Sequence, residues 1–324
     1  MKKILLISSF AFLFVNISKA QQDAQYSQFM FNKLAYNSGF TGTEDKICVT
    51  GLFRSQWMGF GTSSLGESPQ TFVGTIHSPM GQHFGVGMSI LNDKIGFTNN
   101  LNAILSLSYR YTFSNSSMLS VGLGGGFYQQ SVAGSKFKFI DPGDPKIPTS
   151  DVTGLTPDFS FGLYYTKPSI WKFDDFYAGL SATHLTQGKV AYNVPSGTVE
   201  TQLRLHYYFM TGASYALSSS LALEPNILIK YDMAKITTDI NVMAMYNNKI
   251  RGGLTYRTID AIAILAGYKF TPNLQVGMSY DITTSKIRDF SNGSVEVMLK
   301  YCFMPKIKPP VERPPIPRLT PRFL

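Results

Sequence analysis

The two cysteines are the residues of this chain best suited to form a covalent link. Cys48 lies at the start of the first stretch of alternating polar and apolar residues, and Cys302 lies at the end of the last one. Both fall on the polar row of their stretch, which would place them on the same face of a sheet. In an oxidising compartment they could form a disulfide between the first and last strands. Because only some registers satisfy disulfide geometry, two free buried thiols are the alternative.

The histidines and loop acids show no spacing that indicates a metal or catalytic site. The histidines are His77, His83, His184 and His206. None forms a metal-binding pair at close spacing, and none accompanies a Ser or Cys in a known nucleophile motif. The acids within 133–154 lack EF-hand spacing, and the glycines of Gly122–Phe127 lie in an alternating stretch, where they relieve crowding. We therefore predict no catalytic residue, no cofactor and no metal site.

A cleavable leader precedes the elements that must position these residues. Met1–Ala20 has two lysines near its start, a short apolar core over 4–15 and a small-x-small cleavage site at its end. This pattern is typical of a secretory signal peptide, and its apolar core is too short to span a membrane as a helix. We expect Gln21 to be the first mature residue. No Cys follows the cut, so we do not expect a lipoprotein.

The composition suits a membrane barrel better than a soluble domain. Aromatic residues make up 14% of the chain and charged residues 15%, whereas soluble domains carry about 25% charged residues. No later apolar run approaches the length of a spanning helix. The formal net charge is +9, but much of it lies in the leader and in the basic tail 305–324. The remainder is near neutral, which does not indicate a nucleic-acid partner.

Strict alternation of apolar and polar residues is the main structural signal of the chain. In 101–111, leucines and tyrosines occupy one face, and Asn, Ser and Arg110 occupy the other; 294–303 behaves in the same way. A soluble sandwich also alternates, but here the apolar rows often end in aromatic residues, as membrane-interface girdles do. The opposite rows mix Gly and Ser with isolated charges, which suits a wet or plugged lumen. We predict an all-β fold, a transmembrane antiparallel β-barrel.

About fourteen strands can be counted. We expect them to start near Lys46, Gln70, Gln82, Thr98, Met118, Leu155, Lys172, Gln202, Leu221, Ile236, Ile250, Ala261, Asn273 and Ser294. Short connections such as 217–220 and 247–249 alternate with longer ones such as 133–154, 188–201 and 283–293. Short turns normally face the periplasm, so with an even number of strands we expect both termini there. Pro225 lies within one strand, and we expect a bulge around it.

The predicted chain therefore has four parts. They are a signal peptide (1–20), an N-terminal plug or periplasmic segment (21–45), an outer-membrane β-barrel (46–304) and a Pro-rich basic periplasmic tail (305–324). The segment 21–45 is aromatic and has no strict period, so it would be adhesive if exposed. We expect it to pack inside the lumen or across its periplasmic mouth; a flexible lead-in is the alternative. The tail cannot bury a core and should stay extended until it binds a partner.

Two sequence blocks resemble the PorP/SprF family. Gln25–Asn32, followed by Ala35–Asn37 and Phe40–Gly42, is similar to the mature N-terminus of that family. Arg54–Phe60, followed by Ser68–Thr71, is similar to its R-x-Q-W-x-G-F … P-x-T block. One departure is Asn-Ser-Gly-Phe at 37–40, where the family often has Asn-Pro-Ala-Tyr. The last four residues resemble the tails of SprF-like members, which are associated with gliding adhesins.

The resemblance implies an outer-membrane component of the type IX secretion system of Bacteroidota. Such proteins have no known catalytic activity and support export or surface retention of large substrates, often adhesins used in gliding. The implied partners are outer-membrane lipid, the C-terminal domain of a cognate adhesin, the translocon, and the periplasmic ring proteins. The Pro-rich tail could contact the periplasmic machinery as an extended peptide.

Eleven motif and tail residues are candidates for contact with these partners. They are Tyr26, Gln28, Phe29, Met30, Asn32, Arg54, Gln56, Trp57, Arg318, Arg322 and Phe323. Trp57 has an alternative interpretation as a membrane-interface anchor. Two other functions stay open at this point. A diffusion channel or small-solute transporter would use the lumenal charges of both signs, and a barrel enzyme would need a Ser/His/Asp arrangement that the sequence does not suggest.

Overall fold

The computed structural model describes residues 23–60, 68–137, 148–194 and 197–304. The predicted signal peptide and the Pro-rich tail lie outside the described residues. Three candidate contact residues, Arg318, Arg322 and Phe323, belong to this tail and also lie outside the described residues.

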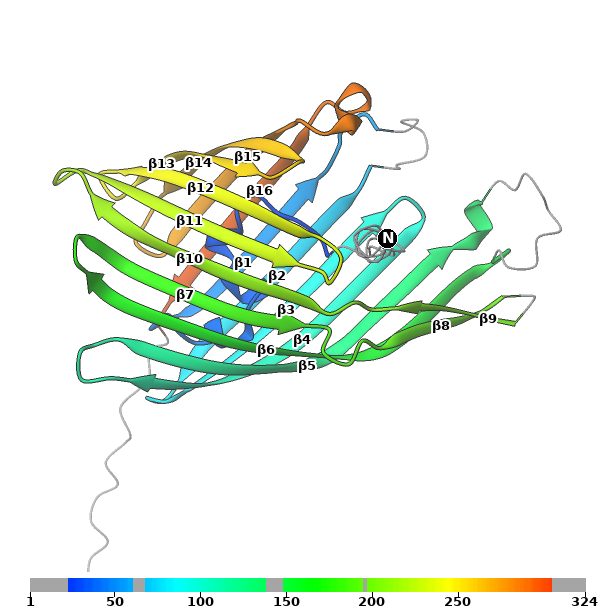
Figure 1. Cartoon of the computed structure of the whole chain (residues 1–324), viewed down its shortest axis with the longest axis horizontal. Helices are drawn as coiled ribbons and strands as arrows, with labels where there is room; N and C mark the ends of the chain where they lie inside the picture. The colour runs from blue at the N-terminus through cyan, green and yellow to red at the C-terminus, as the bar shows by residue number, and fades with distance from the viewer. Residues whose placement is uncertain (1–22, 61–67, 138–147, 195–196, 305–324) are drawn as a thin grey trace, which may run out of the picture.

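Fourteen strands of the described chain close into an antiparallel barrel, which confirms the predicted fold class and strand number (Figure 1). In chain order they are β1 (Ile47–Ser55), β2 (Gln70–Met80), β3 (Phe84–Ile95), β4 (Thr98–Thr112), β5 (Met118–Ala133), β6 (Asp151–Ile170), β7 (Phe173–Thr183), β10 (His206–Ala216), β11 (Leu221–Tyr231), β12 (Ile236–Tyr246), β13 (Ile250–Arg257), β14 (Ala261–Lys269), β15 (Leu274–Thr283) and β16 (Ser294–Phe303). Each strand pairs with its neighbours in the chain, and β1 closes the barrel against β16.

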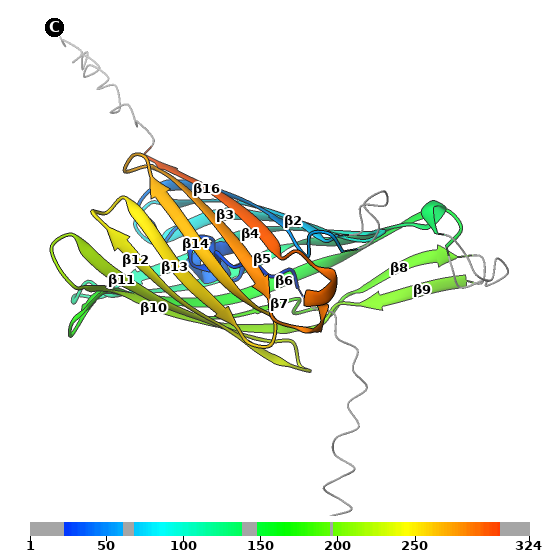
Figure 2. The same ribbon diagram turned by 90° about the horizontal axis from the view of Figure 1, so that it is seen from above.

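One hairpin was not predicted. Strands β8 (Lys189–Val194) and β9 (Gly197–Gln202) form a separate two-stranded sheet between β7 and β10. Figure 2 shows that this hairpin projects beyond the barrel strands. Val190 lies at its base, in a small apolar cluster with Tyr128 and Leu203. The hairpin therefore extends one edge of the barrel away from the membrane-spanning strands.

The alternation along each strand separates an outer apolar face from an inner polar one. On β16, Val297, Leu299 and Tyr301 are exposed, while Glu296 and Met298 are fully buried. The other strands repeat this arrangement, so a continuous belt of Leu, Ile, Val, Phe and Tyr covers the outside of the barrel. An apolar surface of this extent is far larger than soluble proteins expose. It fits the hydrocarbon layer of a membrane.

The connections differ in length at the two ends of the barrel. One end, here named the short-turn end, carries the start of β1, the end of β16 and six short turns. These turns are 81–83, 113–117, 171–172, 217–220, 247–249 and 270–273. The opposite end, here named the long-loop end, carries four longer connections. These are 56–69, 134–150, 184–205 and 284–293. The sequence predicts these long connections, but three others at this end are short, at 96–97, 232–235 and 258–260, so the expected alternation of short and long connections holds only in part.

The bulge expected at Pro225 is absent. The ladder between β11 and β12 continues through Pro225, which pairs with Val242. On the other side of β11, the ladder with β10 has no pair at Pro225 or Glu224 and resumes at Leu223 in the same register. Proline removes one N–H donor from the ladder but adds no extra residue, so the register is kept. The register shift lies one strand further on, where β10 meets β7 between Gly212 and Ser214.

The helical elements of the described chain are short 3-10 turns. Three of them follow one another before β1, at Phe29–Phe31, Lys33–Ala35 and Ser38–Phe40. No helix in the described residues is long and apolar enough to cross a membrane. The main apolar core of the protein lies between these turns and the inner face of the barrel.

Candidate functional site

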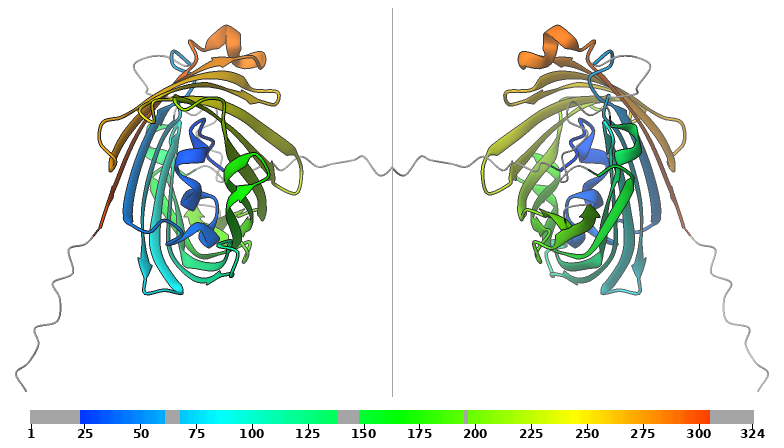
Figure 3. Two further views of the ribbon diagram at one scale, coloured as in Figure 1. Left: turned by 90° about the vertical axis from the view of Figure 1, so that its left-hand side faces the viewer. Right: turned by 90° about the vertical axis from the view of Figure 1, so that its right-hand side faces the viewer.

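Residues 23–45, here named the lumenal segment, run through the inside of the barrel. Figure 3 shows this part of the chain enclosed by the strands. It starts at the long-loop end, where Asp23 contacts His184 and His206, and it ends at the short-turn end, where Glu44 contacts Lys300. The first and last barrel strands do have their free ends together, as expected. The described chain itself, however, begins at the opposite end of the lumen.

Aromatic and aliphatic side chains anchor the lumenal segment. The buried members of the core include Tyr26, Phe29, Met30, Leu34, Tyr36 and Phe40 from the segment, together with inward-facing residues of many strands. The rings of Tyr26 and Tyr36 lie 4.8 Å apart, and Tyr36 also packs against Tyr208 of β10. Burial of each large apolar side chain contributes about 1.5–3 kcal/mol. The lumenal segment and the inner wall of the barrel thus share one apolar core.

Six buried charged side chains form a row on the lumenal wall, here named the charge belt. They are Lys230, Asp239, Arg257, Asp281, Glu296 and Arg54, carried by β11, β12, β13, β15, β16 and β1. Arg54 lies 2.7 Å from Asp281 and 3.2 Å from Glu296. Arg257 lies 3.4 Å from Asp281 and 3.2 Å from Asp239. Each charge therefore has an opposite partner, which buried charges require.

The charge belt also holds the lumenal segment directly. The two carboxylate oxygens of Glu296 accept hydrogen bonds from the backbone N–H groups of Ser27 and Gln28, each at 2.8 Å. The Ser27 hydroxyl donates to Asp281 at 2.8 Å. Lys230 donates to Asp239 at 2.9 Å and lies 3.4 Å from the Gln25 amide oxygen. Bonds between charged and neutral groups in such a buried site are among the stronger hydrogen bonds of proteins.

Close backbone packing fixes the part of the lumenal segment around Asn37–Gly39. Asn37 donates from Nδ2 to the Leu163 carbonyl at 3.0 Å and accepts from the Gly39 N–H at 2.8 Å. Gly122 of β5 leaves room for this turn, because a Cβ there would collide with the Ser38 carbonyl. This glycine belongs to the Gly-rich stretch of β5. Because these glycines have no side chains, the lumenal segment can come close to the backbone of β5.

Lys33 is a partly buried cation within the segment. Its Nζ lies 3.4 Å from the centre of the Tyr177 ring and donates to the Tyr164 hydroxyl at 3.2 Å. Burial, and then the charge of Lys300, lower the pKa of Lys33 to about 7. The ring face of Tyr177 acts in the opposite direction, because it stabilises the ammonium form.

The barrel seam brings the two cysteines together. Cys48 pairs directly with Cys302 across β1 and β16, with their Cα atoms 4.1 Å apart, and the structure joins them by a disulfide. Next to them, Glu44 accepts from Lys300 at 2.6 Å. Burial opposes ionisation of Glu44, but the charges of Lys300 and His77 dominate and lower its pKa. The end of the lumenal segment is therefore tied to the seam.

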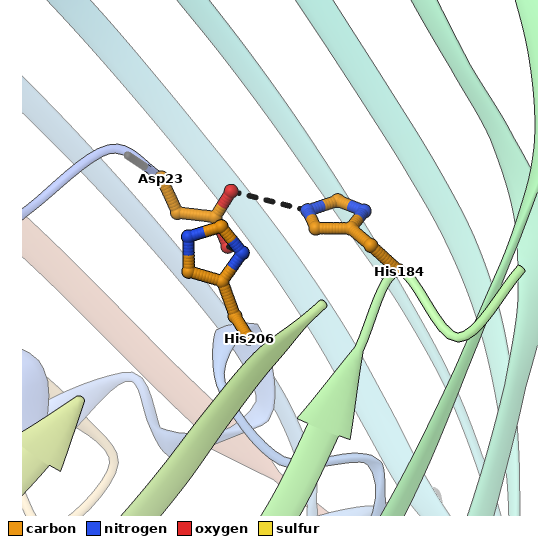
Figure 4. A group of neighbouring side chains, drawn as sticks. All are labelled: Asp23, His184 and His206. Atoms are coloured by element: carbon orange, nitrogen blue, oxygen red, sulfur yellow. Dashed lines mark hydrogen bonds and ion pairs between the residues drawn. The ribbon is translucent and has the colours of Figure 1, made fainter. Parts of the chain in front are cut away.

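A cluster of ionisable groups surrounds the start of the segment at the long-loop end (Figure 4). Asp23 Oδ1 lies 3.1 Å from His184 Nε2, and His184 Nδ1 lies 2.9 Å from Asp158 Oδ2. The Tyr208 hydroxyl donates to Asp23 Oδ2 at 2.6 Å. His206 lies on the other side of Asp23, with its Nδ1 3.8 Å from Oδ2. Burial opposes protonation of His184, but the two carboxylates outweigh it and raise the pKa of His184 to about 10.

Two cavities flank the lumenal segment. One, of about 440 Å³, lies toward the long-loop end and is lined by groups that include Tyr26, Asn102 and Asp158. The other, of about 620 Å³, lies toward the short-turn end, and Lys33 and Arg251 are among the residues that line it. The aromatic part of the segment occupies the space between the two.

The predicted contact residues fall into two groups. Six of them lie buried within the lumen, where they hold the segment to the barrel. They are Tyr26, Gln28, Phe29, Met30, Asn32 and Arg54. Gln56 and Trp57 instead follow β1 at the long-loop end and are only partly buried. Their backbone N–H groups donate to the Pro69 carbonyl at 2.8 Å and to the Ser294 hydroxyl at 3.0 Å, which closes the loop against β16.

Several members of the site were not predicted as site residues. Of the charge belt, Asp239, Arg257 and Asp281 were not named, although each is a charge on an inward-facing row. Their common signal is a charge inside an otherwise apolar alternating strand. The cluster around Asp23 carried no such signal, because its histidines are far from Asp23 in sequence and lie at strand ends.

Comparison with known proteins identifies the family of this chain. The model of the family "Type IX secretion system membrane protein PorP/SprF" matches residues 18–301. No curated protein matches the chain.

Solved structures resemble the barrel at low identity. The toluene transporter TbuX of Ralstonia pickettii has 11% identity and a TM-score of 0.48, with 83% of this chain and 92% of that chain covered. The toluene transporter TodX of Pseudomonas putida has 8% identity and a TM-score of 0.48 over 83% and 92%. The translocator domain of autotransporter NalP from Neisseria meningitidis has 14% identity and a TM-score of 0.43 over 85% and 95%.

The family match includes the lumenal segment and all but the end of the last strand, and it agrees with the resemblance seen in the two sequence blocks. Together with the apolar outer face of the barrel, it supports a place in the outer membrane. The chain belongs to the PorP/SprF family of type IX secretion system membrane proteins.

Proposed function

We propose that this protein is a non-enzymatic barrel that supports export or surface anchoring of a large substrate, such as a gliding adhesin, through protein–protein contacts. The family match supports a role in type IX secretion. The occupied lumen is the observation that favours a role in protein–protein contacts over a role as a diffusion channel. A path for solutes would have to pass the lumenal segment, which is held by buried aromatic residues and by two hydrogen bonds to Glu296.

The two ends of the barrel offer different surfaces to partners. The long-loop end carries the β8–β9 hairpin, in which β8 lies against β6 and the outer edge of β9 has no strand partner within the described chain. Unpaired strand edges can accept a further strand from a partner. We assign this end to the C-terminal domain of the secreted substrate. The short-turn end and the basic tail face the translocon and the periplasmic ring proteins in this proposal.

The test is to purify the native complex from the outer membrane. An epitope tag can be placed in the turn 217–220, most of which is exposed. We expect a large surface protein to co-purify in stoichiometric amount, with or without translocon subunits. An unrelated outer-membrane barrel tagged in the same way is the control.

The same purified protein separates the proposal from the channel alternative. In a planar bilayer, a barrel with its lumenal segment in place should conduct poorly. A barrel that purifies alone and conducts ions steadily would contradict the proposal and support a diffusion channel.

A further inference from the structure

We propose that Asp23, His184 and His206 bind one divalent cation of the Zn²⁺ class, which ties the start of the lumenal segment to the barrel wall. Asp23 begins the described segment, His184 follows β7 directly, and His206 opens β10. The site is distinct from the charge belt and is not needed for the proposed secretion role. It is a binding site that the sequence does not predict.

The spacing of the three side chains suits one small ion. One ligand atom from each of them lies within 4.8 Å of the others. Two ligands of a tetrahedral Zn²⁺, each at about 2.0–2.1 Å from the ion, lie roughly 3.3 Å apart. The distance from Asp23 Oδ1 to His184 Nε2 is already 3.1 Å. The centres of the two imidazole rings are 5.7 Å apart, and Nδ1 of His206 lies 3.8 Å from Oδ2 of Asp23, so His206 lies beside the same carboxylate.

Two of the three ligands have the outer partners that metal ligands usually have. Asp158 holds Nδ1 of His184 at 2.9 Å, which directs Nε2 toward Asp23. The Tyr208 hydroxyl holds Oδ2 of Asp23 at 2.6 Å and orients that carboxylate. A carboxylate behind a ligating histidine fixes the ring and makes it a better ligand. An ion pair between Asp23 and His184 alone would not require these two additional partners, Asp158 and Tyr208.

His206 has a ring nitrogen that nothing in the described chain uses. Its Nδ1 contacts the Arg204 carbonyl at 2.9 Å, whereas its Nε2 is buried and has no hydrogen-bond partner among the described residues. A buried nitrogen without a partner costs free energy that a ligand can recover. To bind an ion held by Asp23 and His184 through Nε2, the ring turns about Cβ–Cγ and gives up the Arg204 carbonyl.

The ligand set selects the class of ion. Two imidazoles and one carboxylate suit Zn²⁺ and its neighbours among the transition metals, whereas Ca²⁺ and Mg²⁺ prefer oxygen ligands alone. The local charge agrees, because Asp23 and Asp158 together bring two negative charges to the cluster. The alternative is a protonated His184 held between two carboxylates without any ion.

The experiment uses the full mature chain, purified in detergent without a histidine tag and stripped of metal with a chelator. Co²⁺ is titrated into the folded barrel while its visible absorption is recorded, and Zn²⁺ is then added. We expect one equivalent of Co²⁺ to give the intense absorption of a four-coordinate site, and one equivalent of Zn²⁺ to displace it. A featureless spectrum or binding without a defined stoichiometry in the wild-type protein would overturn the proposal.

Variants decide which residues bind. Asp23→Asn and His206→Gln should each abolish the Co²⁺ spectrum, and Asp158→Asn should weaken affinity about 10–100-fold. His83→Gln is the matched control, because His83 is exposed at the short-turn end, and it should bind like the wild type. Folding is checked by the gel mobility of the unheated barrel. If His206→Gln does not fold, Asp23→Asn carries the test, since Asp23 lies outside every strand. Unchanged Co²⁺ binding in Asp23→Asn would refute the site.

Discussion

Replacement of Glu296 by Gln should release the lumenal segment while leaving the barrel closed. The carboxylate of Glu296 accepts the Ser27 and Gln28 N–H groups and the Arg54 guanidinium. A Gln side chain has one oxygen acceptor, so one backbone N–H and part of the Arg54 charge would lose their partner. The strands that carry Glu296 and Arg54 keep their backbone pairing, since this change removes no ladder hydrogen bond.

The expected loss follows from these contacts. Each hydrogen bond to a charged group contributes about 1.5–3 kcal/mol, and removal of one partner of a buried ion pair costs about 3–5 kcal/mol. Once the segment leaves, water reaches the lumen and relieves most of the penalty on Arg54. The loss therefore falls mainly on docking of the segment. A change of about 3–5 kcal/mol raises the undocked population by roughly two to nearly four orders of magnitude.

Hydrogen exchange of residues 25–45 in the folded barrel measures this population directly. We expect exchange in Glu296→Gln to accelerate in this segment, while β-strand amides keep their protection. The matched control is Glu200→Gln, because Glu200 forms an exposed ion pair with Lys189 on the hairpin, and such pairs contribute little. If segment exchange in Glu296→Gln is as slow as in the wild type, the charge belt does not hold the segment and the reasoning is wrong.

Three further predictions address the rest of the molecule. The pKa of Lys33 is about 7 in the docked state and near 10.4 when the segment is free. Docking should therefore strengthen as pH rises from 7 to about 10. Hydrogen exchange of Lys33→Met should no longer show this pH dependence. Unfolded, unreduced protein should contain no titratable thiol, and two free thiols would contradict the disulfide. The double variant Cys48→Ser/Cys302→Ser should lower the free energy of unfolding by about 2–4 kcal/mol. Leu299→Lys on the lipid face should lower the free energy of unfolding in vesicles by about 2–4 kcal/mol, whereas Ser218→Lys in an exposed turn should change it little; equal effects would contradict the assigned faces.

The strands could be predicted from the sequence because a barrel wall has two different solvents. Every second side chain meets lipid and every other one meets the lumen, so the period of two is strong. Turn residues then mark where a strand ends. The strands that begin at Gln70, Thr98 and Leu221 were predicted at the same residue. The β8–β9 hairpin escaped prediction, because it lies beyond the membrane and has no lipid face to impose the pattern.

The interior of the site could be predicted only in part, because it depends on register and depth. Alternation shows that Arg54 and Glu296 face inward, but only the strand pairing places them opposite each other. The lumenal segment has an aromatic composition without a period, which predicts burial but not direction. The cluster at its start joins residues 161 positions apart, Asp23 and His184. Neither spacing nor composition can reveal such a contact.

The family motif has a structural explanation that does not need a partner. Its residues Ser27 and Gln28 meet Arg54 and Glu296 inside the barrel, so the two motif blocks recognise each other within one chain. We therefore expect the motif to serve closure of the lumen. In Glu296→Gln, capture of the secreted substrate should then stay at the wild-type level while ion conductance rises. If capture increases when the segment is released, the motif residues themselves bind a partner, and docking in the lumen is a resting state that competes with that partner.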